Sequence, residues 1–377
     1  MTKRCREEKP GALHPDADWF KEGVHLMSAA RYVTLVALLA TGGALSRAAA
    51  AHAQTEELHN FLRTRAGFSE AELEAVDHVS VVVKTLHTSA ESEVALLGVA
   101  LFRASTEFFL GMYQDIERFE SGLGPLKKVS DPPRPEDLEA LVLPDKDVAA
   151  LATCRIGKCD LKLGEEGITR FQTEVDWTSP QASQQAQSLV RDLALKFLTA
   201  YRQGGNQALG IRRDNKRPTL VREQFEGLLE NSDYILTYVP ELHRYLLEYP
   251  RAELSGATDF LYWAINDFGL DPVVRLSHVT IYSLGEGQNS SAVIASKQLY
   301  FSRLFYTGLD LRFLVRNQND PNDESFYLVT VSRLRSDELG GLFGGVLRKA
   351  AEEGARDGLQ RYLEVSKPAI ESYYRAR

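Results

Sequence analysis

The sequence lacks the motifs by which many enzymes reveal their chemistry. It contains no G-x-S-x-G elbow, no P-loop and no H-E-x-x-H helix. Gly285-Glu286-Gly287 lacks the third glycine of a dinucleotide-binding turn and follows no parallel-sheet unit. The sequence therefore predicts no catalytic residue, no cofactor and no metal site, although an acid–base enzyme built from dispersed residues stays open. Five histidines without ligand spacing support this: His59, His78, His87, His243 and His278.

Cysteine is also scarce, and acidic residues outnumber basic ones. Three cysteines are too few for a small, disulfide-dense scaffold. The net charge of -8 argues against a protein that binds duplex nucleic acid, because such proteins usually carry a basic surface. The 377 residues, of which 44% are hydrophobic and 25% charged, are typical of an ordinary folded protein with room for two or three domains.

The apolar run near the N-terminus is short. Val33–Leu45 lies between Arg31 and Arg47, whereas a membrane span needs roughly 20 apolar residues, so permanent anchoring is the weaker alternative. Residues 27–53 instead match a signal peptide, with a cleavage site near Ala53. We interpret the polar residues 1–26 as an upstream mis-start before the true start at Met27. The predicted location is periplasmic or secreted.

Export changes the interpretation of Cys154 and Cys159, which form a C-x4-C motif. In a reducing cytosol this spacing would be weighed for metal or redox use, but it lacks the second ligand pair that a zinc site needs. In an oxidising compartment a short-loop disulfide is favoured, and Gly157 gives the small ring its backbone freedom.

Alternating apolar and polar residues predict antiparallel strands late in the chain. Asp337–Arg377 then turns helical, and Pro368 inside it predicts a kink or a break. The predicted fold class is α+β, with a curved antiparallel sheet wrapped on a long C-terminal helix. The strand-forming runs are Pro272–Leu284, Ala292–Phe305 with its continuation Gly308–Arg316, and Ser325–Arg335.

The chain is predicted to divide into three mature segments. Residues 54–134 hold a strand pair and a helix, residues 135–269 a large helical insertion, and residues 270–377 the sheet and the C-terminal helix. Ser69 and Glu72 match a capping box at a helix start. Outside the late sheet we expect strands at His78–Leu86 and Glu93–Phe102, and helices at Ser105–Phe119, Gln181–Gln203, Thr219–Leu229, Val239–Tyr249 and Ser255–Asp267.

This element order resembles the helix-grip fold of START-type lipid-transfer domains and polyketide cyclases. The resemblance implies a sheet that encloses an apolar cavity against the C-terminal helix. It rests on Val79–Leu86 with Glu93–Phe102, on Ser105–Phe119, and on Pro272–Arg335 running into Asp337–Leu363. The chain also resembles an uncharacterised family of secreted bacterial proteins, from which no function transfers. That likeness lies in stretches such as Cys154–Leu163, Phe260–Trp263, His278–Ile281, Ala295–Tyr300 and Val331–Leu339.

Polar residues on the mixed strands are the candidate ligand-binding groups, because a few polar groups orient a ligand in a largely apolar cavity. They have alternative readings: His278 as a satisfied buried histidine, and the last two arginines as a surface ion-pair cluster with Asp337 and Glu338. The candidates are His278, Lys297, Tyr300, Arg303, Arg333 and Arg335.

The sequence favours a binding protein over an enzyme. The expected function is to bind a lipid or another apolar small molecule between the sheet and the C-terminal helix, with peripheral membrane contact and no nucleic-acid partner. One alternative is a cell-envelope enzyme of the cyclase or hydrolase type that uses polar residues in the same cavity. A second alternative is a non-catalytic interaction module, with the aromatic stretch Tyr245–Trp263 as its partner surface.

Overall fold

The computed structural model describes residues 55–377, with gaps at residues 79, 121, 123, 267–271, 285–290, 321, 323 and 341–343. The predicted signal peptide and upstream segment lie outside the described residues. None of the helices in the described part of the chain combines the length and apolar character that a membrane crossing requires.

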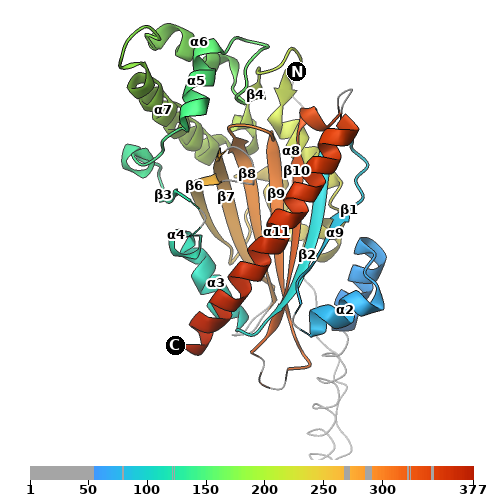
Figure 1. The fold of residues 1–377 in the computed structure, drawn as a ribbon. Coiled ribbons are helices and arrows are strands. Elements are labelled where there is room, and N and C mark those ends of the chain that lie inside the picture. Colours follow the sequence, from blue (N-terminus) through green and yellow to red (C-terminus); the bar gives the residue numbers. More distant parts are fainter. Residues whose placement is uncertain are drawn as a thin grey trace, which may run out of the picture. The chain divides into compact units, whose positions relative to one another are not determined.

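Eight strands form one open, curved antiparallel sheet (Figure 1). Their order across the sheet is β1-β2-β10-β9-β8-β7-β6-β3, so the last five strands form a meander. The α+β fold class and the late antiparallel sheet are thus confirmed. The strands are β1 Val82–Leu86, β2 Glu93–Phe102, β3 Leu126–Val129, β6 Thr258–Asn266, β7 Val273–Leu284, β8 Ser291–Phe301, β9 Thr307–Arg316 and β10 Phe326–Arg335.

Helices flank the sheet, beginning with one at residues 55–66. A two-stranded ribbon of β4 (Ile211–Arg212) and β5 (Thr219–Leu220) lies within the long segment between β3 and β6. The remaining helices are α2 Glu70–Asp77, α3 Thr106–Gln114, α4 Ile116–Phe119, α5 Asp145–Thr153, α6 Glu165–Glu174, α7 Ala182–Gly204, α8 Val221–Glu230, α9 Asp233–Tyr238, α10 Pro240–Glu248 and α11 Gly344–Arg375, with short 3-10 turns at Pro135–Leu138, Gly205–Leu209 and Asp337–Gly340.

One face of the sheet, here called the inner face, packs against α3, α4 and α11. Figure 1 shows α11 crossing this face diagonally, with α3 and α4 beside its C-terminal end. Phe109 of α3 and Leu363 of α11 share a buried core with Ile294 and Leu328 of the strands. The predicted placement of the C-terminal helix on the sheet is therefore confirmed.

The opposite face, here called the outer face, packs against the helix at residues 55–66, α2 and the helices between β3 and β6. Successive side chains of a strand point to opposite faces, so Val293 joins this outer core while Ile294 joins the inner one. Leu198 of α7 and Phe225 of α8 complete the outer core. The sheet is therefore buried on both faces, as the middle of three layers.

A glycine on β2 sets the close approach of α11 to the sheet. A Cβ atom built on Gly98 would lie 2.9 Å from Cδ1 of Leu363 and 3.2 Å from Cδ2 of Leu359. The helix continues through Pro368, so the predicted break does not occur. Packing on this side holds the helix together near the proline, where buried Glu371 accepts a hydrogen bond from the backbone amide of Arg103 at 3.0 Å.

Two predictions about the smaller elements were wrong or incomplete. Ser255–Asp267 does not form a helix, because Thr258–Asn266 is strand β6. Phe260–Ala264 are all buried in a row, and a run that is apolar on both faces shows no alternation to distinguish a strand from a helix. The short strand β3 was not predicted. The capping box of Ser69 and Glu72 is confirmed at the start of α2.

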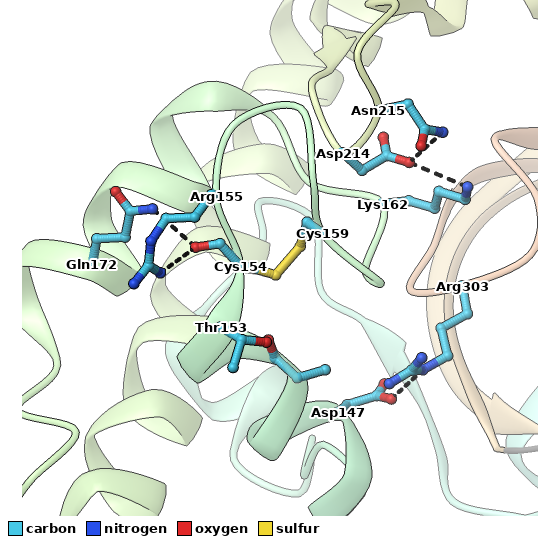
Figure 2. Close-up of a disulfide and its surroundings, with 11 residues drawn as sticks. Asp147, Thr153, Cys154, Arg155, Cys159, Lys162, Gln172, Asp214, Asn215 and Arg303 are labelled. Carbon is cyan, nitrogen blue, oxygen red and sulfur yellow. Dashed lines mark hydrogen bonds and ion pairs between the residues drawn. A yellow bond between two sulfur atoms is a disulfide. The ribbon is translucent and has the colours of Figure 1, made fainter.

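The disulfide expected from the C-x4-C motif joins Cys154 and Cys159 (Figure 2). It closes the turn after α5, where Gly157 has φ +81°, a conformation that glycine adopts without strain. The amide of Cys159 donates to the carbonyl oxygen of Asp214 at 2.9 Å, and that of Gly157 to Arg213 at 2.7 Å. The ring therefore also holds the loop that carries Asp214. A disulfide is consistent with an oxidising compartment.

Candidate functional site

The six polar residues that the sequence singled out lie on the side of the sheet away from α11. Each contacts side chains from the outer-face layer or from the strand ends. The predicted ligand space lies on the inner face instead, so these residues are not the groups that line it.

His278 of β7 lies beneath α7 with a bond on each ring nitrogen. Its Nε2 lies 3.0 Å from Oδ1 of Asp259, and its Nδ1 lies 2.9 Å from the hydroxyl of Tyr201. Thr280 donates to the same carboxylate oxygen at 2.6 Å. Burial lowers the pKa of His278, and the Asp259 carboxylate opposes this shift only in part. This is the satisfied buried histidine of the alternative reading.

Lys297 faces His278 across the β7–β8 pair and is 1% exposed. Its Nζ donates to Oδ1 of Asn206 and lies 4.0 Å from the ring centroid of Phe225. Burial holds the pKa of Lys297 well below its ordinary value. The lysine fills the centre of the outer core, where α7 and α8 cover it.

Tyr300 and Arg303 each form a separate pair with a residue of the outer layer. Cζ of Arg212 stands 5.2 Å from the ring centroid of Tyr300. Arg303 binds the carboxylate of Asp147 on α5, as Figure 2 shows. These pairs link the insertion to the sheet.

Arg333 and Arg335 do form an ion-pair cluster, but it is buried and its acid is Glu93. Glu93 is 0% exposed and binds Nη1 of Arg333 and, at 3.0 Å, Nη2 of Arg335. The alternative interpretation, a surface cluster with Asp337 and Glu338, is therefore wrong in its burial, and the acid that pairs with both arginines is Glu93. Asp337 binds Lys162 at 3.3 Å instead.

The inner face carries rows of side chains that run across the strands. Toward the β7–β8 hairpin the rows are apolar, and toward the opposite end they become polar. This change in polarity under α3 and α11 is the geometry expected of a site for an amphipathic ligand. Three successive rows are Ser283, Ala292, Leu314 and Leu328; Ile281, Ile294, Arg312 and Thr330; and Val279, Ser296, Asp310 and Ser332.

Arg312 of β9 marks the border between the apolar and polar rows. It is 9% exposed, and its guanidinium carbon lies 5.4 Å from the ring centroid of Tyr113 on α3 and 5.9 Å from that of Tyr362 on α11. Burial acts to lower the pKa of Arg312, but Tyr113, Tyr362 and Asp310 outweigh it and raise the pKa above its ordinary value. The side chain is therefore a permanent cation between the sheet and the two helices.

Other polar groups of the inner face are paired with one another. Nη2 of Arg275 donates to Glu120 at 2.7 Å. Asp310 accepts from Nε2 of Gln298 at 3.1 Å and from the hydroxyl of Ser332. Further hydrogen bonds join Tyr113 to Ser296 at 3.1 Å, Ser277 to Gln298 at 2.6 Å, and Arg275 to Asn266 at 2.5 Å.

An open hollow of about 910 Å³ lies along α3 and α4. Glu107, Gln114 and Asp115 line it and are exposed, whereas Phe109 and Tyr113, which face the sheet, do not. Ser283, which belongs to the first of the three inner-face rows, also lines the hollow, so the hollow reaches the edge of the inner face. In the described part of the chain, no group of three or more His, Cys, Asp or Glu side chains is placed to hold a metal ion.

Searches for similar proteins found no match among protein-family models, curated proteins or solved structures. Sequence reasoning missed Arg312, Thr330, Ser296 and Tyr113. The available signal was the alternation of Arg312 with Leu311 and Phe313, which marks a polar face but does not show that α3 and α11 cover it.

Proposed function

We propose that the protein is exported and binds a lipid or another apolar small molecule between the inner face and α11. The observation that carries the proposal is the border on the inner face, where apolar rows meet rows of hydroxyl, amide and charged groups beneath two helices. Most of these polar groups bond one another, but Nε and Nη1 of Arg312 and the hydroxyl of Thr330 have no partner, and burying an unbonded polar group costs free energy that a core serving stability alone would avoid.

The connectivity supports the same proposal. The elements follow one another in the order of the helix-grip fold: strand β2, helices α3 and α4, a run of antiparallel strands and a long C-terminal helix. Both α3 and α11 lie on the inner face, which is where that fold holds its cargo. The insertion between β3 and β6 covers the outer face and leaves the inner face to the cargo.

Export is supported by the disulfide between Cys154 and Cys159. Disulfides persist in oxidising compartments and are rare in the cytosol. Mass measurement of protein recovered from outside the cytoplasm is expected to find both cysteines oxidised. Two free thiols in that protein would contradict the export part of the proposal.

The binding part is tested by organic extraction of the purified protein followed by mass spectrometry. We expect a recurrent apolar compound in near-stoichiometric amount. Thr330→Leu adds bulk on the inner face, and its neighbour Val329→Leu adds bulk on the outer face of the same strand. The compound should be depleted in Thr330→Leu and retained in Val329→Leu. Its absence from the unmodified protein, or equal loss in both variants, would refute the proposal.

A further inference from the structure

The guanidinium of Arg312 lacks the partners that a buried cation normally has. Its Nε and Nη1 atoms are buried and have no hydrogen-bond partner. Among the described residues, no carboxylate forms an ion pair with it either. Two tyrosine rings flank it, but a ring face accepts no conventional hydrogen bond and offsets only part of the lost hydration.

The nearby acids do not supply what is missing. Glu120 is bonded to Arg275, and Asp310 is bonded to Gln298 and Ser332. An uncompensated buried charge is costly, and proteins usually pair such groups. The open donors of Arg312 therefore point to an acceptor that is not part of the chain.

Thr330 gives the second, independent observation. It lies directly opposite Arg312 in the β9–β10 register, it is 1% exposed, and its hydroxyl has no partner. Arg312 can only donate, and the hydroxyl of Thr330 donates as readily as it accepts. A group with two or more acceptor oxygens would satisfy both side chains at once.

We infer that the cargo carries an acidic oxygen group, a carboxylate or a phosphate, which Arg312 and Thr330 bind at the border of the polar rows. The inference rests on the proposed function and narrows its ligand to apolar acids. The acid group lies against Arg312 between α3 and α11, and the apolar part of the cargo lies along the rows that contain Ile294 and Leu314.

The test compares three probes with one apolar chain: oleate, 1-oleoyl lysophosphatidate and methyl oleate. Each is titrated into delipidated protein of the full mature chain. The charge-assisted hydrogen bonds predict that at least one acid binds about 10- to 100-fold more tightly than the ester. The acid that shows this preference identifies the group as carboxylate or phosphate.

Arg312→Met should abolish the preference, because it weakens the binding of the acid and leaves the affinity for the ester unchanged. Lys297→Met is the matched control, because it removes a buried basic side chain from the outer face and should keep the preference. If Arg312→Met does not fold, Arg312→Gln replaces it, and the comparison of probes on the unmodified protein stands by itself.

The outcomes separate this inference from the proposed function. Equal affinity for acid and ester, or a preference that survives Arg312→Met, overturns the role of Arg312 and leaves apolar binding intact. Failure of all three probes to bind, together with extracts free of apolar compounds, overturns both.

Discussion

Removing the charge of Glu93 is expected to cost much of the stability of the fold. Glu93 begins β2 and is 0% exposed. Its carboxylate binds Arg333, Arg335 through Nε at 3.1 Å and Nη2 at 3.0 Å, and Nδ2 of Asn231 at 2.9 Å. One acid therefore neutralises two guanidinium groups at the end of the last strand before α11.

Glu93→Gln keeps the size of the side chain but leaves both guanidinium groups without a counter-charge. The side chains of Arg333 and Arg335 are 8% and 11% exposed, so water compensates little. Breaking a buried pair on one side costs about 3–5 kcal/mol. The free energy of unfolding of a whole domain is only about 5–15 kcal/mol.

The assay is urea denaturation followed by circular dichroism. Glu353→Gln is the control, because its ion pair with Lys349 joins side chains that are 56% and 77% exposed and should contribute less than about 1 kcal/mol. Replacing the cluster together, as Glu93→Leu with Arg333→Met and Arg335→Met, should recover most of the loss. A cost below about 1 kcal/mol for Glu93→Gln would refute the reasoning, since it would mean that water already solvates the arginines.

Three further predictions concern the disulfide, the seat of α11 and the outer core. Replacing Cys154 and Cys159 by serine should lower the free energy of unfolding by about 2 kcal/mol, the low end for so short a ring, and an unchanged denaturation midpoint would contradict this. Gly98→Val should lower the free energy of unfolding by about 1–3 kcal/mol in the same assay, because the new side chain meets α11. Gly111→Ala in α3, where a Cβ atom would have nothing within 4 Å, should raise it by up to about 1 kcal/mol. Equal effects of the two substitutions would argue against the close packing of α11 on Gly98. Burial lowers the pKa of Lys297 in the folded protein. Between that lowered pKa and the ordinary value of 10.5, the lysine is protonated in the unfolded chain but not in the folded one. The free energy of unfolding should therefore rise with pH in this range. Lys297→Met should remove this rise, which denaturation curves recorded across the same pH range would show. If the lysine were solvated, the unmodified protein and the variant would have the same pH dependence.

Local signals predicted the elements whose patterns are regular. Ser69 and Glu72 fixed the start of α2, and alternation revealed β9, where Leu309 and Leu311 share a face. The cysteine pair followed from spacing and the predicted compartment. The strand β6 was missed because both of its faces are buried, so Tyr262 and Trp263 are equally apolar in sequence.

The side of the sheet that carries the candidate site could not be predicted in the same way. His278 and Lys297 are polar residues among apolar neighbours, which is also what a cavity would show. Only the packing of α7 and α8 against them reveals that they are outer-core residues. For Arg312 the sequence misleads in the opposite direction. Its alternation with apolar residues is typical of a strand face exposed to solvent, but segments distant in the sequence cover it.

The insertion leaves the sheet after β3 and returns to it at β6, and these two strands are neighbours. Val129 at the end of β3 pairs with Leu261 near the start of β6. The whole excursion is therefore topologically one oversized hairpin loop, and a short turn could replace it without altering strand order. Such a shortened chain would expose an apolar sheet surface that includes Trp263 and Leu276. It would need a second molecule or another covering segment to stay soluble.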